Sequence, residues 1–531
     1  MQASEILPAF PIAALVAAIL FLLSGFARRL RLVALVWSIA VLPTLAFITY
    51  RLWDHYVGPD TFAFWRFNLS PANMPVLLPL AVVAPLLLLA SEGKDLSRGR
   101  DGIASALCCL AIAAAMAAIL CDHFFLLAIA FAVTTLCLTG SAVLRKRGSG
   151  LPPAGLIPVA VSDLCLALGV LLIYVNDSGR GLFFPAAALD PMGRLAAPCG
   201  LLLAAALLRL GSFPFHRWMS LVSKGGKEVR LVHVLIDLVL GAYLLYMVTR
   251  VFFEWSGFWI WICFGAGVIT LLATLYSLLR SVASLEMWGL LCTAAGAHLV
   301  ISASAASQMS AVAVRFGVFA AVSILALVHM GAESGSFRTA GGTALRGLPP
   351  LAGFAWRWME FQVLILAFAS GSRILLIAAL PLVFAGALIE GFLPVLWSPA
   401  ETEKTPQFAL HSTAVLLAVF LLALGLYPGS FTDLLMREYG IAINLPFAGW
   451  TSLGWAILIC AVLAVIVLYL VHREKESARG PFLQGALPLV AGGPFPTFPT
   501  WKVLENRILA FAALALLFAF WAAALIYLGL K

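Results

Sequence analysis

The amino-acid sequence predicts an all-α, polytopic integral membrane protein with about 14 to 16 transmembrane helices. Hydrophobic residues make up 63% of the 531 residues and charged residues only 11%, and the mean hydropathy is +1.05. A water-soluble domain carries roughly a quarter charged residues. Apolar runs of about 20 residues, the length that crosses a bilayer as a helix, recur along the chain. Because hydrocarbon offers the backbone no water, each run must bond its own amides as a helix.

The apolar runs follow one another with short polar connections. The spans predicted in the first half are residues 8–27, 32–50, 73–91, 102–121, 123–143, 155–175, 195–215 and 229–252. Those predicted in the second half are 257–279, 283–305, 311–331, 350–369, 373–397, 409–428, 450–471 and 507–529. The longest polar stretches leave no room for a soluble domain, and repeated prolines in the last of them, residues 472–506, predict an irregular connection. We therefore expect a single membrane domain over 1–531, with its core at 73–430 and two C-terminal spans after it.

Basic residues gather in every second connection. They follow the first, third, fifth, seventh, eleventh and fifteenth predicted spans, as Arg28, Arg29 and Arg31; Lys94, Arg98 and Arg100; Arg145, Lys146 and Arg147; Arg217, Lys224, Lys227 and Arg230; Arg338 and Arg346; and Arg473, Lys475, Arg479 and Lys502. Since positive loops remain in the cytoplasm, we expect a multi-pass protein of the cell inner (plasma) membrane with its N-terminus outside. The net charge of +9 then reflects topology and contact with membrane lipid, and no nucleic-acid partner is expected. Residues 1–7 contain no basic signal-peptide segment, so the first run is expected to be a retained span.

The sequence contains no pattern that predicts a cofactor or metal site. It lacks G-x-x-x-x-G-K-[ST], a usable G-x-G-x-x-G, H-E-x-x-H and paired haem histidines. The nine cysteines are scattered through apolar runs without C-x-x-C spacing. We expect no cofactor, no metal and no catalytic site of its own.

Ionisable residues inside the apolar runs are the candidate functional residues. A charge at the bilayer centre costs at least ~2.5 kcal/mol, so such residues usually line a hydrated interior. Arg209 lies five residues before Pro214. His233 and Asp237 are four residues apart on one helix face, where they could share a proton. The proton-relay candidates are Asp163, Arg209, His233, Asp237, Arg315, His329 and Glu333.

Structural roles are open alternatives for several of these residues. Arg209 could extend to the cytoplasmic interface, and His233 could simply bond a neighbouring helix. Asp163 and Arg315 fit structural ion pairs as well as conduction. Glu286 and His298 carry less weight, and Glu390 is expected near a span end.

Two stretches share a pattern that is typical of an internal repeat around a transport site. Residues 205–237 and 315–360 both combine prolines with ionisable groups inside apolar sequence. The second stretch includes Arg357 and Glu360.

Residues 209–243 read RLGSFPFHRW, then GGKEV, then HVLIDLVLGAY. This order resembles the antiporter-like, proton-translocating subunits of complex I (NADH:quinone oxidoreductase) and of Mrp-type Na+/H+ antiporters. In that family a lysine stands four residues before F-P-[LF]-H-x-W, and the next span reads H-x(7)-G-x-Y. Arg209 takes the place of the lysine, and the motif falls on Phe213, Pro214, His216, Trp218, His233, Gly241 and Tyr243. A second segment, GLPPLAGF, resembles the family's G-[LI]-P-P-x-x-G-F at Gly347, Pro349, Pro350, Gly353 and Phe354.

The chain departs from the family pattern at its charged positions. The glutamate of the family's fifth span is missing, because residues 124–141 contain no carboxylate. The family's D-x-K-R-x-L-A-Y-S segment keeps only Arg280 and Ala283, and the twelfth-span lysine or histidine aligns near Ala320. Because arginine stays protonated, Arg209 could bias a water chain but could hardly pass a proton as lysine does.

The resemblance implies an antiporter-like fold with discontinuous helices and a subunit that moves protons or Na+. Its partners would be other membrane or peripheral subunits of an NADH:quinone oxidoreductase-type, hydrogenase-type or Mrp-like complex. A second interpretation is the membrane energy-coupling partner of a cytoplasmic zinc protein in inorganic-carbon uptake. A third is a degenerate structural subunit without ion conduction.

Overall fold

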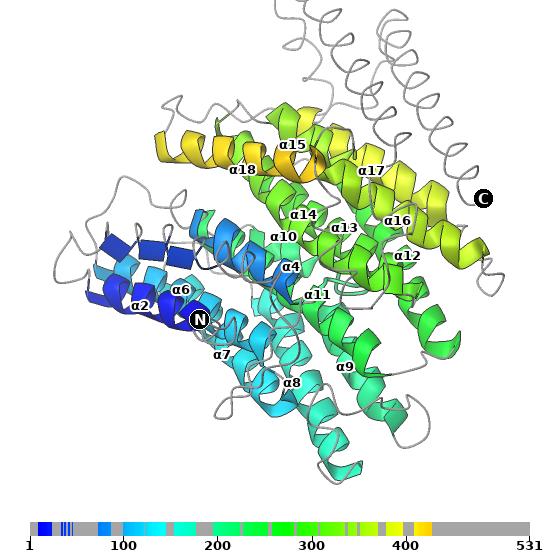
Figure 1. Cartoon of the computed structure of the whole chain (residues 1–531), viewed down its shortest axis with the longest axis horizontal. Helices are drawn as coiled ribbons and strands as arrows, with labels where there is room; N and C mark the ends of the chain where they lie inside the picture. The colour runs from blue at the N-terminus through cyan, green and yellow to red at the C-terminus, as the bar shows by residue number, and fades with distance from the viewer. Residues whose placement is uncertain are drawn as a thin grey trace, which may run out of the picture.

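The computed structural model of the chain describes residues 9–23, 73–86, 99–121, 123–144, 153–176, 195–223, 227–252, 257–280, 284–305, 308–334, 338–347, 351–369, 379–396 and 408–426, and scattered positions in 33–45. The predicted spans at 450–471 and 507–529 lie outside the described residues. Helix labels are those of Figure 1.

The described chain is helical throughout its regular structure. In order, its helices are α2 (Ala9–Leu23), α4 (Met74–Leu78), a π-helical turn (Pro79–Val83), α6 (Gly99–Leu120), α7 (Phe124–Leu144), α8 (Pro153–Asn176), α9 (Ala196–Arg209), α10 (Trp218–Ser223), α11 (Lys227–Val251), α12 (Gly257–Arg280), α13 (Ser284–Ser304), α14 (Gln308–Ser334), α15 (Arg338–Leu345), α16 (Ala352–Ala369), α17 (Ala379–Leu396) and α18 (Phe408–Leu426). The all-α prediction is confirmed.

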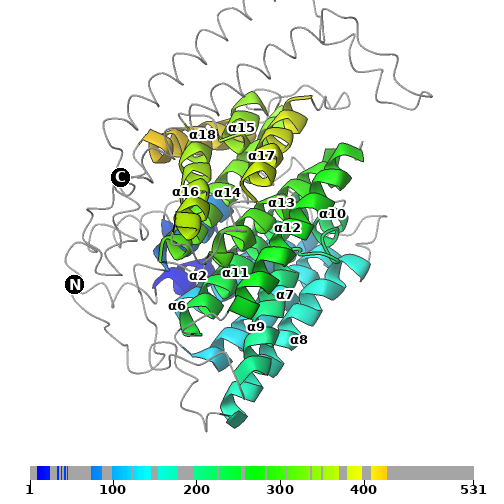
Figure 2. The ribbon, with the colours of Figure 1, turned by 90° about the vertical axis from the view of Figure 1, so that its right-hand side faces the viewer.

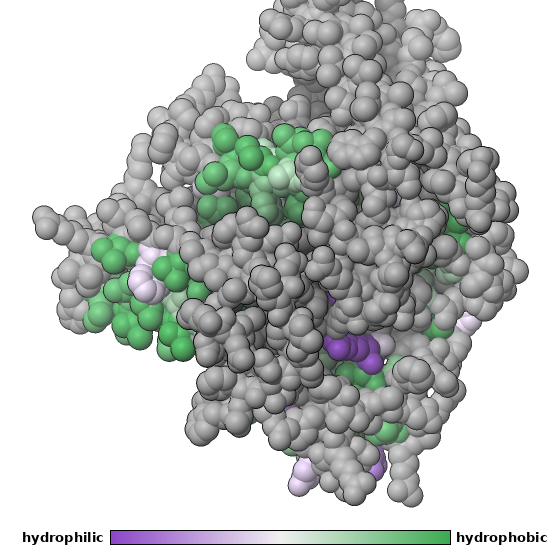
Figure 3. Space-filling model, viewed as in Figure 1, coloured by the Kyte–Doolittle hydropathy of each residue, from purple (hydrophilic) through white to green (hydrophobic). Residues whose placement is uncertain are grey.

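Seven of the described helices are long and apolar enough to cross a membrane, namely α6, α7, α8, α11, α12, α13 and α14. Shorter apolar helices accompany them, including α2 and α9. Large apolar side chains point outward, among them Leu136, which is 71% exposed, and Leu164, which is 58% exposed. Figure 3 shows apolar surface over the described parts of α2 and α18. Such a surface suits lipid or neighbouring membrane helices, and the chain is a multi-pass membrane protein.

The helices that bury most of their surface lie in the middle of the molecule. Of the residues in the spans within α11, α13 and α14, 89%, 100% and 94% are buried. In the spans within α7, α8 and α12 only 39% of the residues are buried. Figures 1 and 2 both place α11, α13 and α14 between α7–α9 on one side and α15–α18 on the other. A charge on these central helices is therefore shielded from lipid by protein.

The predicted span at 195–215 is interrupted. The helix α9 ends at Arg209, and α10 begins only at Trp218. Between them Gly211 has a φ of 73°, a left-handed conformation that favours glycine, and Pro214 has no amide hydrogen to continue a helix. The hydropathy of the segment indicates a span but does not reveal this break, which places Arg209 at a helix end inside the protein.

A second break separates α15 from α16. Gly347 has a φ of 69°, and a Cβ built on Gly353 would lie 1.7 Å from the carbonyl oxygen of Ala344, so only glycine fits there. The connection that follows the eleventh predicted span contains the helix α15 (Arg338–Leu345). Helix α15 packs against α14 and α17.

Two glycines of α13 allow the first break to pack closely. A Cβ on Gly289 would lie 2.5 Å from the Cα of Ser220 in α10, and one on Gly296 would lie 2.5 Å from the carbonyl oxygen of Leu210. These glycines are seven residues apart and so lie on one face of α13. The backbone of the break thus rests directly on the most buried helix.

Candidate functional site

Arg209 lies at the end of α9 with a fully buried side chain. Its Nη1 donates to Asp237 Oδ1 of α11 at 2.5 Å, and its Nη2 donates to Asp163 of α8. The same Nη2 also donates to Thr135 Oγ1 of α7 at 2.8 Å, and the guanidinium lies 4.5 Å from the centre of the Phe131 ring. This burial excludes the alternative in which Arg209 extends to the interface.

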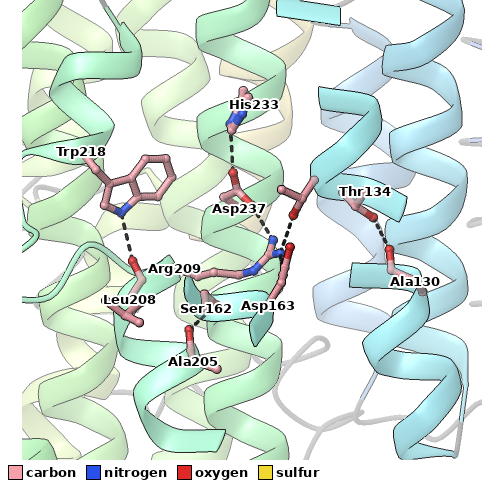
Figure 4. A network of polar contacts seen from close by, with 11 residues as sticks. Ala130, Thr134, Ser162, Asp163, Ala205, Leu208, Arg209, Trp218, His233 and Asp237 are labelled. Carbon is pink, nitrogen blue, oxygen red and sulfur yellow. Dashed lines mark hydrogen bonds and ion pairs between the residues drawn. The ribbon is translucent and has the colours of Figure 1, made fainter. Parts of the chain in front are cut away.

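His233 completes the group, one turn before Asp237 on α11. Its Nδ1 lies 2.9 Å from Asp237 Oδ2, and both side chains are buried. The two atoms are at ion-pair distance without an aligned hydrogen bond. The Trp218 ring stands edge-on to the imidazole with centres 6.4 Å apart, and its Nε1 donates to the Leu208 carbonyl at 3.0 Å. Figure 4 shows Asp237 between Arg209 and His233.

We call Asp163, Arg209, His233 and Asp237 the first cluster. It contains one permanent positive charge and two carboxylates, so its net charge is −1 with a neutral histidine and zero with a protonated one. Asp163 is 16% exposed at its side chain, and the other three residues are almost completely buried. Because these side chains are buried, the net charge of the first cluster is zero only when His233 carries a second proton.

A carboxylate reaches Arg209 although residues 124–141 contain none, because Asp163 contacts it. Asp163 comes from α8, the sixth predicted span, rather than from α7. Thr135 of α7 instead offers a hydroxyl to Arg209. The departure from the family pattern therefore leaves the positive charge paired.

A second cluster of the same composition lies among α13, α16 and α17; it consists of His298, Arg357, Glu360 and Glu390. The imidazole Nδ1 is 2.9 Å from Glu360 Oε1, and its Nε2 is 3.0 Å from Glu390 Oε1. Arg357 donates to Glu360 Oε2 at 3.0 Å and to Glu390 Oε2 at 2.9 Å. All four side chains are at most 2% exposed. The contacts close a ring.

The sequence reasoning did not select this ring. His298 carried little weight, and Glu390 was expected near a span end, whereas it lies inside α17 and is buried. The one local signal was the pair Arg357 and Glu360, three residues apart in an apolar helix just after the second break. The other two members come from distant segments.

The structure places the remaining relay candidates elsewhere. The Arg315 guanidinium lies 4.8 Å from the centre of the Tyr246 ring, and its Nε donates to the Ala311 carbonyl at 3.0 Å. His329 lies against Trp288, with ring centres 5.1 Å apart. The backbone of Glu333 belongs to α14, but its side chain lies outside the described residues.

The family-motif residues shape the two breaks. A Cβ on Gly241 would lie 3.1 Å from the Cβ of Arg209, so this glycine lets α11 approach α9 closely. The buried Tyr243 hydroxyl donates to the Ile119 carbonyl at 3.1 Å. Phe213, Pro214 and His216 lie in the turn of the first break, with the Phe213 and His216 rings stacked at 5.6 Å.

The motif of the second break is described in part. Phe354 is buried and stacks on Trp358 with ring centres 6.2 Å apart. Pro349 and Pro350 lie outside the described residues.

The chain has the fold of membrane subunits of respiratory and Mrp complexes. It matches a chain of the Mrp complex from Dietzia sp. with a TM-score of 0.70 and 18% identity, over 98% of this chain and 62% of that one. It matches a chain of the membrane-bound sulfane sulfur reductase, an archaeal respiratory membrane complex, with a TM-score of 0.72 and 16% identity, over 98% and 94%. A chain of respiratory complex I from Thermus thermophilus matches with a TM-score of 0.60 and 20% identity, over 79% and 97%. The predicted antiporter-like fold is thereby confirmed.

Comparisons by sequence add nothing to this result. No protein-family model matches the chain, and no curated protein matches it. The present chain spans 62% of the length of the matched Mrp chain.

Proposed function

We propose that the chain is a membrane subunit that translocates protons, or Na+, within a multisubunit complex of the complex I or Mrp type. The observation that carries this proposal is the first cluster, in which the buried Asp237 contacts both a permanent cation and a titratable histidine. Ionisable residues held at such depth are rare and are typical of ion pathways.

In this proposal His233 carries the proton and Arg209 does not. An arginine keeps its proton under almost all conditions, whereas histidine changes its charge near neutral pH. His233 would take up a proton at Nδ1 or Nε2 and be stabilised by Asp237, 2.9 Å away. Arg209 would hold Asp237 and Asp163 ionised as acceptors.

The position of the cluster beside a helix break supports the proposal. In transporters, interrupted helices commonly border the ion site, because their ends offer backbone groups and permit local movement. Here the first cluster joins the end of α9 to α8 and α11. A shift of α9 would change the contacts of Arg209 with both carboxylates.

The missing fifth-span glutamate and the missing lysine are arguments for a degenerate structural subunit. The pairing of Asp163 with Arg209 weakens the first of these arguments, because a carboxylate is present at the arginine. The comparisons support a place within a larger assembly, since the three matched chains named above belong to complexes. The partners would be other membrane or peripheral subunits.

Proton flux in reconstituted vesicles tests the proposal. The wild type would be compared with Arg209→Ala and His233→Ala, and with His123→Ala as a control. His123 lies just after α6 and contacts Phe125, which is not part of the first cluster. We expect both cluster variants to lose flux and the control to keep it; absent flux in every protein, or equal flux in all four, would refute translocation through this site. Proteins that co-purify with the wild type would identify the complex.

A further inference from the structure

The ring of the second cluster places a carboxylate oxygen against each nitrogen of His298. Nδ1 faces Glu360 at 2.9 Å, and Nε2 faces Glu390 at 3.0 Å. Each of these contacts needs a hydrogen between nitrogen and oxygen. A neutral imidazole carries only one N–H, so it can serve one carboxylate but not both. The geometry therefore requires one proton more than a neutral histidine and two ionised glutamates contain.

The sum of the charges in the ring also indicates one added proton. Arg357 contributes one positive charge and the two glutamates contribute two negative charges, which leaves −1 with a neutral imidazole. Neither Arg357 nor the glutamates are more than 2% exposed, so solvent cannot compensate this charge. One added proton brings the sum to zero.

We propose that the second cluster is a binding site for a single proton, held by His298 as an imidazolium between Glu360 and Glu390. The bound proton joins three helices, because His298 belongs to α13, Glu360 to α16 and Glu390 to α17. Without it, the pair of Arg357 with Glu360 on α16 persists, but the lone pair of one imidazole nitrogen faces a carboxylate at about 3 Å. The contact of α13 with either α16 or α17 then becomes repulsive, depending on which nitrogen lacks the hydrogen.

Among the described residues, the charged groups that act on the imidazole are Arg357, Glu360 and Glu390. Helix α14 also packs against α13, and its Arg315 and His329 contact the rings of Tyr246 and Trp288. The balance of charge at His298 is therefore set within the ring.

The two clusters hold their protons differently, although each contains one arginine, one histidine and two carboxylates. In the first cluster the histidine contacts one carboxylate without an aligned hydrogen bond. In the second, both ring nitrogens of His298 are bonded. The role of the second cluster, as a further proton-binding site in the chain, rests on the proposed proton translocation. The protonation of His298 itself does not depend on translocation.

The test is the protonation state of His298, read from ¹⁵N NMR of histidine-labelled protein in lipid nanodiscs. The chain has eight histidines, and His298→Gln assigns the signal by its loss. At a pH of about 7.5 an ordinary histidine is about 90% neutral. We expect both nitrogens of His298 to show the N–H signature at that pH.

The variant Glu390→Gln removes one negative charge, so the ring is neutral without the added proton. We expect His298 in this variant to become neutral, with its remaining proton facing Glu360. Glu286→Gln is the matched control, because Glu286 lies on the same helix α13 but pairs with Arg217 at 2.8 Å; it should leave His298 doubly protonated. Glu360→Gln provides a second ring variant if Glu390→Gln does not fold, and the same change to neutral is expected.

A neutral His298 in the wild type would overturn the proposal without any variant, and so would an imidazolium that survives both ring substitutions. A separate measurement of proton flux in vesicles distinguishes failure of this proposal from failure of the proposed function. An intact imidazolium in a protein without flux would refute translocation alone. A neutral His298 in a protein with normal flux would refute only the proton-binding ring.

Discussion

Replacing Arg209 by leucine perturbs the first cluster at its centre. The change removes the contacts with Asp163 and Asp237 and leaves the fully buried Asp237 without its permanent cation. An unpaired buried charge costs about 3–5 kcal/mol, and we expect the free energy of unfolding to fall by that amount. The double variant Arg209→Leu/Asp237→Asn removes the stranded charge as well. We therefore expect it to recover about 2–3 kcal/mol relative to the sum of the single variants.

Steric trapping in a bilayer measures these free energies, and thermal unfolding followed by tryptophan fluorescence gives their order. Arg217→Leu is the control, because Arg217 is 60% exposed at its side chain and pairs with Glu286 at the surface. Its loss should cost about 0–1 kcal/mol. Additive effects of the Arg209 and Asp237 substitutions, or equal losses for Arg209→Leu and Arg217→Leu, would refute the reasoning that the first cluster is a coupled buried unit.

Two further predictions concern the packing around the site. Gly296→Ala introduces a Cβ 2.5 Å from the carbonyl oxygen of Leu210, which belongs to the backbone and cannot turn away, so it should cost about 1–3 kcal/mol in the same unfolding assay. Gly265→Ala meets nothing within 4 Å and should be neutral or stabilising by up to about 1 kcal/mol; a loss equal to that of Gly296→Ala would contradict the packing argument. Tyr243→Phe removes one of two donors to the same carbonyl of α6, and since Asn73 still donates to it at 2.9 Å, the loss should stay near 0.5 kcal/mol. A loss above about 2 kcal/mol would show that Asn73 does not satisfy that carbonyl.

The sequence predicts the long described helices well because the membrane imposes a minimum length on each apolar run. The predicted span at 102–121 corresponds to α6, and that at 123–143 corresponds to α7. The prolines within residues 205–237 predicted an interrupted helix in this stretch, but hydropathy did not place the end of the helix at Arg209, because apolar residues continue beyond it. Gly211 and Pro214 were the only local signals of that break.

Within the candidate site, the sequence predicts only the contacts between residues of one helix, which follow from the helix period. His233 and Asp237 are four residues apart, and the structure places them in contact as their spacing predicts. The pairing of Asp163 with Arg209 joins residues 46 positions apart. It depends on how α8 packs against α9, which no local pattern encodes.

The second cluster was missed for the same physical reason. His298 and Glu390 are separated by 92 positions and meet only because α13 and α17 pack together. Taken singly, each is one polar residue in an apolar run. They form a ring of charged groups only through their contacts with Arg357 and Glu360.

The proton flux of Asp237→Asn in vesicles under an imposed membrane potential tests the central claim most directly. Asp237 contacts both Arg209 and His233, and asparagine keeps its shape while removing its charge. Arg209 remains paired with Asp163, so the fold should persist and elution in size-exclusion chromatography should match that of the wild type. We predict that the flux falls at least tenfold. Flux equal to that of the wild type in a correctly folded variant would contradict proton movement through the first cluster.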